Sequence, residues 1–308
     1  MTTVVHRSAS SSTIAAPDTP KVRPICEADV EASARAAFAA HSTLADRHGY
    51  PSEHPTLAFS IGLMTHKAKD PSAYGFVAEA DGRILGSVFL NVFPPAPVAA
   101  IGPMTVDPSA EGAGAGRLLL ATALDDARTR DITQVRLIQS PANLRSLALY
   151  TKAGFEVREP LVLMQRADAA KSAAGPVADK TVRKATMDDA FYCERLCARV
   201  LGFSRSGEIR AAIEQQTANV VLQDHLIAGY ATGIGFRGHA VAETSEDIAA
   251  LIAAAPAIMG PGFFVPVRNT RLMRWLFGNG YRAVWQATLM SCGSYQEPAG
   301  AFLPSIAY

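Results

Sequence analysis

The second half of this 308-residue chain repeats landmarks of the first half, and this repeat limits the folds that the chain can adopt. Gly154 follows Asn143 by eleven positions, and Gly280 follows Asn269 by the same eleven positions. A Leu-Met pair begins nine positions after each of these two glycines. A chain of this length also fits two domains of roughly 150 residues each. We therefore predict a tandem duplication of one fold.

The composition of the chain changes along its length and indicates the domain boundaries. Residues 1–20 are rich in Ser, Thr, Ala and Pro, which predicts a disordered tail. Residues 167–180 are small and polar, as expected of a linker. The first copy of the fold is therefore predicted at 21–166 and the second copy at 181–308.

Charge and cysteine content argue against several classes of function. The formal net charge of +1 gives no reason to expect binding to nucleic acid or to a membrane surface. The four cysteines form no Cys-x-x-Cys pair, and we find no further metal ligands to accompany Cys193 and Cys197. The N-terminal tail lacks the apolar core of a signal peptide. We expect a cytoplasmic protein with reduced thiols and no metal ion.

One stretch, Ile248–Val267, is uncharged and has the length of a membrane span. It contains three prolines and two glycines, which would break a spanning helix. The sequence therefore predicts a helix, a loop and a strand here, within a domain that lies in water.

The most informative local stretch joins a strand to a helix through glycines. An apolar run over residues 99–106 predicts a buried strand, and good helix formers begin at Arg117. Between them stand Gly112, Gly114 and Gly116. Glycines let the backbone approach a ligand, and a helix start offers unpaired N–H groups with partial positive charge. This order predicts a site for a phosphate or pyrophosphate.

Two common phosphate motifs do not fit this loop. A Walker loop would have Lys and Ser or Thr after Gly116, and a dinucleotide fingerprint would have glycine at Leu119. The stretch instead resembles the acetyl-CoA loop of the GNAT N-acetyltransferase family, Gln/Arg-x-x-Gly-x-Gly/Ala after a strand that ends in Val-x-Pro. The matching letters are Val106-Asp107-Pro108 and Gly114-Ala115-Gly116. Glu111 departs from the family, because it places an acid where Gln or Arg is usual.

A second stretch downstream matches the same family. Its second motif reads Asn-x-x-Ala/Ser-x-x-Leu-Tyr-x-Lys-x-Gly-Phe, and the two motifs occur here in the family's order. The matching residues are Asn143, Ser146, Leu149, Tyr150, Lys152, Gly154 and Phe155. In layout the resemblance covers most of residues 21–166, and its specific letters lie within 104–155.

The resemblance implies an α/β chain of two tandem GNAT folds, each with a central mixed, mostly antiparallel sheet flanked by helices. It implies acetyl-CoA as co-substrate in the first copy alone, because the second copy has no glycine loop and has Leu276 where the first has Tyr150. Asn143 would bind the pantetheine arm, cap a helix, or do both, and Arg117 would contact phosphate or lie in solvent. The residues expected to bind the cofactor are Met104, Thr105, Val106, Gly112, Ala113, Gly114, Ala115, Gly116, Arg117, Asn143 and Ser146.

The resemblance also implies direct transfer of an acetyl group to a primary amine. Tyr150 would donate a proton or hydrogen bond to the departing thiolate, with a core aromatic as the alternative. The strand at 101–106 contains no acid, so the general base stays unassigned. The candidates are His48, Glu53 and His54, with His239 and Glu243 if the two halves face each other.

The acceptor is expected to be an amine of a small molecule, with a protein amino group as the next choice. A rival interpretation is a CoA-binding sensor or structural tandem protein that transfers nothing. Glu111 and the absence of an acid on the strand at 101–106 favour this interpretation slightly, and intact Asn143 and Tyr150 oppose it. The sequence does not indicate the oligomeric state.

Overall fold

The computed structural model describes residues 19–50, 52–166 and 180–306. The predicted disordered tail and linker lie almost wholly outside these residues. The described part of the first half contains six strands and four α-helices. Their bounds are β1 (Lys21–Pro24), α1 (Val30–His48), α2 (Leu57–Lys69), β2 (Ala73–Ala80), β3 (Arg83–Val92), β4 (Val98–Val106), α3 (Ala115–Thr129), β5 (Gln134–Gln139), α4 (Leu144–Lys152) and β6 (Glu156–Arg166).

The second half follows a similar order, with one additional strand at its end. Its elements are β7 (Thr181–Lys184), α5 (Ala190–Leu201), α6 (Ser206–Glu214), β8 (Asn219–Gln223), β9 (Leu226–Ala231), β10 (Ala240–Ala242), α7 (Ser245–Ala253), β11 (Phe263–Pro266), α8 (Thr270–Gly278), β12 (Tyr281–Gly293) and β13 (Ala301–Leu303). The stretch Ile248–Val267 is therefore the helix, loop and strand that its prolines predict. No helix among the described residues is long and apolar enough to cross a membrane.

Local chemistry accounts for several of these boundaries. Asp81 and Gly82 both have positive φ (51° and 71°), as a two-residue hairpin turn between β2 and β3 requires. The side chain of Thr56 caps α2 by accepting the N–H of Phe59 at 3.1 Å. Helix α1 ends at Gly49, whose N–H donates back to the carbonyl of Ala45 at 2.8 Å.

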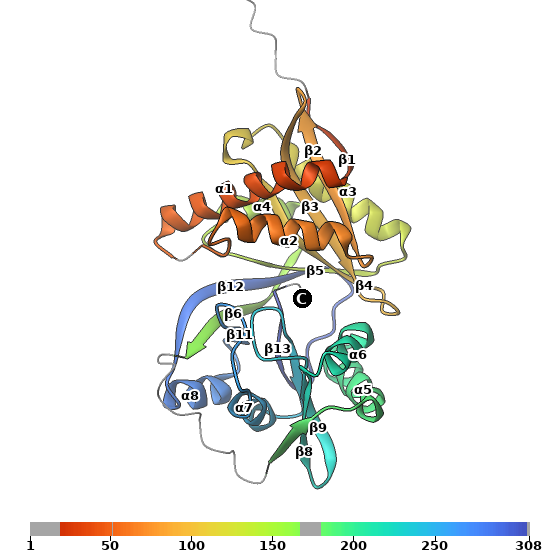
Figure 1. Ribbon diagram of the computed structural model, residues 1–308, viewed down its shortest axis with the longest axis vertical. Helices are drawn as coiled ribbons and strands as arrows, with labels where there is room; N and C mark the ends of the chain where they lie inside the picture. Colours follow the sequence, from red (N-terminus) through yellow and green to blue (C-terminus); the bar gives the residue numbers. More distant parts are fainter. Residues whose placement is uncertain (1–18, 51, 167–179, 307–308) are drawn as a thin grey trace, which may run out of the picture.

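The two halves share one sheet (Figure 1). Its strand order is β1-β2-β3-β4-β5-β12-β6-β11, and a second sheet has the order β13-β10-β9-β8-β7. Strand β12 of the second half therefore lies between β5 and β6 of the first half, antiparallel to both. The tandem α/β architecture with sheets flanked by helices is as expected. The first sheet is mixed and mostly antiparallel, whereas the second sheet is antiparallel throughout. The exchange of strands between the halves is an addition that the sequence repeat does not reveal.

The hydrophobic cores follow this shared sheet. On the first half, α1 and α2 pack on one side around Phe89, and α3 packs in a separate cluster around Leu119. A third cluster joins the halves, because it contains Leu163 of β6 and Leu289 of β12 together with residues of α5 such as Leu196. Burial of apolar surface therefore holds the two halves against each other.

Candidate functional site

Strands β4 and β5 separate at the centre of the first half. They pair only where Val98–Ala100 lies beside Gln134–Arg136, while the other edge of β4 pairs with β3 as far as Val106. The N–H of Asp107 donates to the carbonyl of Leu85 in β3, at 2.8 Å. Because hydrogen bonds alternate along a strand, the N–H groups of Met104 and Val106 point the other way, into the opening.

The start of α3 faces the same opening. Its first helical hydrogen bond runs from the N–H of Leu118 to the carbonyl of Gly114 at 3.1 Å. The N–H groups of Ala115, Gly116 and Arg117 therefore have no partner within the helix. The loop before them turns through Gly112 and Gly114, whose φ values of 92° and 85° suit glycine. These donors and the helix dipole make an anion site.

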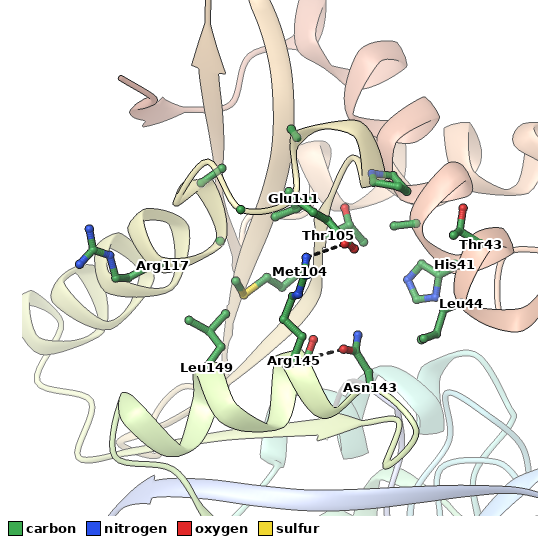
Figure 2. Close-up of a pocket in the computed structure, with 18 of the residues that line it drawn as sticks. His41, Thr43, Leu44, Met104, Thr105, Glu111, Arg117, Asn143, Arg145 and Leu149 are labelled. Carbon is green, nitrogen blue, oxygen red and sulfur yellow. Dashed lines mark hydrogen bonds and ion pairs between the residues drawn. The ribbon is translucent and has the colours of Figure 1, made fainter. Parts of the chain in front are cut away.

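A cavity of about 580 Å³ lies between these elements. Figure 2 shows the residues that line it. Tyr150 and every residue expected to bind the cofactor line this cavity, except Ala113. Arg117 is exposed, and its side chain points away from the labelled residues at the centre of the view.

Asn143 and Glu111 have defined partners in this cavity. The side-chain oxygen of Asn143 accepts the N–H of Ser146 at 3.0 Å, so Asn143 caps α4. Its amide nitrogen points into the cavity (Figure 2), which leaves it available to a ligand. Glu111 forms an ion pair with Arg145 at the start of α4. The charge of Glu111 is therefore balanced where the sequence suggested repulsion of a pyrophosphate.

Tyr150 lies at the inner end of the cavity and is 7% exposed. Its hydroxyl contacts the sulfur of Met104 at 3.9 Å, and its ring packs against Phe155 with ring centres 5.8 Å apart. Burial raises the pKa of Tyr150 to about 12. The phenol therefore keeps its proton at neutral pH and can donate it within the cavity.

A second cavity, of about 250 Å³, adjoins the first at Tyr150. It is lined by parts of α1, α2, β4 and β5 and by residues of the second half. Six residues line both cavities: His41, Leu44, Met104, Asn143, Ser146 and Tyr150. A molecule in one cavity would therefore meet a molecule in the other beside the hydroxyl of Tyr150.

The second cavity contains a carboxyl group next to two imidazoles. Oε1 of Glu53 lies 3.9 Å from Nδ1 of His41, whose ring stacks on that of His54 with centres 4.1 Å apart. Nδ1 of His54 is 2.8 Å from the hydroxyl of Ser60. Burial raises the pKa of Glu53 to about 7 and lowers the pKa of His41 to about 3 and of His54 to about 4. Near neutral pH both imidazoles are uncharged, and Glu53 is the group that exchanges a proton.

The remaining base candidates lie elsewhere. His48 lines neither cavity and stacks loosely with Tyr50, with ring centres 6.3 Å apart. His239 is buried, with Nε2 3.0 Å from the hydroxyl of Tyr230. Glu243 forms an exposed ion pair with Arg199. His41 was missed by the sequence analysis. It lies on the face of α1 that lines the larger cavity, together with positions 40, 43, 44 and 47 at helical spacing.

The corresponding region of the second half is closed on the strand side. The edge of β10 that corresponds to the open edge of β4 is paired with β13. Asn269, the counterpart of Asn143, caps α8 but also accepts a hydrogen bond from the hydroxyl of Ser245 at 2.8 Å. A cavity of about 370 Å³ remains beside it, with Glu243 and Glu246 in its lining. Arg268 and Arg271 also line this cavity, and Arg271 forms an ion pair with Glu246.

Groups of three or more side chains suited to bind a metal ion are absent from the part of the chain that the structure describes. Cys193 and Cys197 are both buried on the inner face of α5. Burial raises the pKa of the Cys193 thiol to about 12, so this thiol stays protonated.

Comparison with known proteins agrees with this geometry. The sequence model of the Acetyltransferase (GNAT) family matches residues 39–155. A mycothiol acetyltransferase from Beutenbergia cavernae is 41% identical over 87 residues, which make up 28% of this chain. The match spans only 29% of the length of that relative. The sequence similarity is therefore local and lies in part of the chain.

Solved structures extend the similarity of fold to nearly the whole chain. A GCN5-related N-acetyltransferase from Sphaerobacter thermophilus has a TM-score of 0.63 at 15% identity, and the match covers 92% of this chain and 99% of that one. The tandem GNAT protein from the clavulanic acid biosynthesis pathway has a TM-score of 0.54 at 15% identity, with coverage of 89% and 98%. Residues 39–155 thus match the GNAT acetyltransferase family, and the overall fold of the chain is similar to that of a tandem GNAT protein.

Proposed function

We propose that the chain transfers an acetyl group from acetyl-CoA directly to a primary amine of a small molecule. One observation carries this proposal: the two cavities meet at Met104, Asn143 and Tyr150. The larger cavity offers backbone donors suited to a cofactor, and the smaller one offers a carboxyl group suited to an amine. Relatives named mycothiol acetyltransferases support an acceptor of small-molecule size.

The residues of the larger cavity fit acetyl-CoA. The free N–H groups at the start of α3 would hold the pyrophosphate, and the side-chain amide of Asn143 would bond to the pantetheine arm. The outward N–H groups of Met104 and Val106 would bind the carbonyl oxygens that lie along β4. When bound, acetyl-CoA supplies an acetyl group activated as a thioester.

Three groups of this chain would then serve the transfer. Glu53 accepts a proton from the acceptor amine, which makes the nitrogen nucleophilic as the new N–C bond forms. The strand N–H groups near Met104 stabilise the negative charge that develops on the carbonyl oxygen. Tyr150 gives a proton or hydrogen bond to the sulfur as the C–S bond breaks. His41 and His54, both uncharged, keep Glu53 in a weakly polar environment.

We further propose one cofactor site per chain, in the first half. Strand β13 occupies the position in the second half that is open beside β4 in the first half. We call the smaller cavity, of about 250 Å³, the acceptor cavity. In this proposal the second half completes it by contributing Phe236, Arg237 and Ile306. A cytoplasmic location, where acetyl-CoA is available, is part of the same proposal.

Gly116→Asp tests the cofactor site. Gly116 has helical backbone geometry, and an added Cβ would meet neighbouring side chains at 3.5 Å or more, so the fold accepts the change. A carboxylate at a helix start favours the folded state but opposes a bound pyrophosphate. We expect the Kd for acetyl-CoA to rise about 100-fold, equivalent to about 2.8 kcal/mol. Calorimetric titration measures this.

Gly116→Asn is the matched control, because it adds the same bulk without charge. We expect it to lose much less affinity than Gly116→Asp. Two binding sites in the native chain would show that the second half also binds acetyl-CoA. No binding at near-millimolar acetyl-CoA would refute the assignment of the larger cavity.

Measuring the release of CoA from the native protein in the presence of amines distinguishes an enzyme from a CoA-binding sensor. A sensor would bind acetyl-CoA but release no CoA when amines are added. The ion pair between Glu111 and Arg145 weakens one of the two sequence features that favoured a sensor, and the other is the absence of an acid on the strand at 101–106.

A further inference from the structure

The acceptor cavity carries more positive charge than its contents balance. Lys67 of α2 and Arg237, on the loop between β9 and β10, both line it. Glu53 is the one carboxylate among its lining residues, all of which are described, and burial raises the pKa of Glu53 to about 7. The cavity therefore has two basic side chains beside an acid that is only partly ionised at neutral pH.

The side chain of Lys67 is held in place by two polar neighbours, Asn91 and Asp70. Its ammonium donates to the side-chain oxygen of Asn91, and it lies 3.9 Å from Oδ2 of Asp70. The amide of Asn91 is itself anchored, because it donates to the carbonyls of Ala100 at 3.1 Å and Gly102 at 2.7 Å. The side chain of Lys67 keeps only 13% of its surface exposed. Lys67 is therefore held at this cavity rather than extended into solvent.

Arg237 approaches from the second half and has no ion-pair partner among the described residues. Burial lowers the pKa of Lys67, and the nearby charge of Arg237 lowers it further, while Asp70 and Glu208 act in the opposite direction. Glu208 is itself paired with Arg205. The two cations are thus close enough to repel each other, and a bound anion would remove that repulsion.

Apolar side chains also line the cavity. Leu63 comes from α2, Phe236 from the loop that carries Arg237, and Ile306 from the end of the described chain. The N–H of Ile306 donates to the carbonyl of Phe236 at 2.9 Å, which attaches the chain end to that loop. A ligand that fits this cavity would have an apolar part against these side chains, with one polar end near Glu53 and an anionic end near Lys67 and Arg237.

We propose that the acceptor is a small primary amine that also carries an anionic group, a carboxylate or phosphate, bound by Arg237 and Lys67. This inference rests on the proposed acetyl transfer and names its class of substrate. The amine faces Glu53 and Tyr150, the apolar body contacts Leu63 and Phe236, and the anion pairs with the two cations. The second half of the chain thereby takes part in selecting the substrate.

Matched pairs of acceptors test this assignment. The L-amino acids are assayed beside their amides, 6-aminohexanoate beside hexylamine, and 2-aminoethyl phosphate beside ethanolamine, with release of CoA as the readout. We expect the anionic member of the accepted pair to have a kcat/KM at least about tenfold higher. Equal use of the neutral members would overturn the proposal while leaving acetyl transfer intact. If the preference appears with the amino acids or 6-aminohexanoate, the anion bound is a carboxylate. If it appears with 2-aminoethyl phosphate, the anion bound is a phosphate.

Arg237→Ala identifies the residue responsible. We expect the preference for the anionic member to fall at least about fivefold, and Arg237→Lys to retain part of it. Arg274→Ala is the control, because it removes one exposed arginine of α8, far from both cavities, and should keep the full preference. A full preference in Arg237→Ala would contradict the inference. Unchanged binding of acetyl-CoA by the variant shows that it is folded.

The anion site can also be tested if the chain transfers no acetyl group. If acetyl-CoA binds but no amine is acetylated, the proposed function is wrong, and the anion site is then decided by calorimetric titration of hexanoate. Binding that weakens in Arg237→Ala supports the anion site. Absent binding, or equal binding in the variant, refutes it.

Discussion

Tyr150→Phe is expected to lower kcat for acetyl transfer by about 10²- to 10⁴-fold, with little change in the Kd for acetyl-CoA. The substitution removes only the hydroxyl, whose one recorded contact is the weak one at 3.9 Å to the sulfur of Met104. The ring still fills its place against Phe155. Because the pKa of Tyr150 is raised to about 12, the hydroxyl is a proton donor throughout the neutral range.

Steady-state kinetics with a fixed acceptor measures this loss, and thermal unfolding checks the fold. A variant with native stability and a greatly reduced kcat assigns a chemical role to the hydroxyl. Native kcat in Tyr150→Phe would leave Tyr150 as a core aromatic residue, which is the alternative that its place on an amphipathic helix allows.

Glu53→Gln is expected to lower kcat about 100-fold or more, because the amide has nearly the same shape but cannot accept the proton of the amine. The native enzyme should also show a pH profile set by Glu53. The raised pKa of about 7 means that kcat/KM falls as the pH drops below about 7 and the carboxylate is protonated. This limb of the profile should be absent in the variant.

Although Glu53→Gln should lower kcat, it should raise the stability of the folded state above neutral pH. Glu53 ionises near pH 4.5 in the unfolded chain and near pH 7 in the folded chain. The folded state therefore binds the proton more tightly, so it loses stability relative to the unfolded state as the pH rises from about 4.5 to 7. At pH 8 the neutral glutamine avoids this cost, and the melting temperature of Glu53→Gln should exceed that of the native chain.

His48→Gln is the matched control for Glu53→Gln, because His48 lies at the end of α1 but lines neither cavity. Its kcat and pH profile should remain native. An unchanged acidic limb in Glu53→Gln would show that another group, or water, accepts the proton.

The cofactor cavity could be outlined from the sequence because its parts are local. Gly112, Gly114 and Gly116 belong to one strand-to-helix connection, and Asn143 and Tyr150 lie on one short helix. Their spacing is determined by backbone geometry, so short motifs contain most of the information. The acceptor cavity differs, because Glu53, Lys67 and Arg237 come from three separate segments.

Glu53 illustrates what the sequence could not decide. It follows α1 in a loop, and its composition gives no reason to prefer it to His48 or His54. Its proton affinity depends on burial against His41, which is a tertiary effect. Arg237 had no local signal either, since it lies on an irregular loop of the second half.

The exchange of β12 was hidden by the repeat that revealed the duplication. Leu163-Met164 and Leu289-Met290 occupy equivalent positions, so β6 and β12 have similar apolar patterns. Either strand could serve either sheet on pattern alone. The choice depends on how the halves dock, which no short stretch of sequence encodes.

The exchanged strand also sets the order in which this protein can mature on the ribosome. When β6 leaves the exit tunnel, β12 has not yet emerged, and the place between β5 and β6 stays empty for roughly ten seconds at ordinary rates of synthesis. During that time two strand edges offer free hydrogen-bonding groups to neighbouring chains. A nascent chain arrested when β6 has left the tunnel but β12 has not yet been made should therefore be digested faster at β5 and β6 than a full-length chain that is held outside the tunnel by a C-terminal extension. For this chain, translation past Gly293 is a condition for completing its first domain.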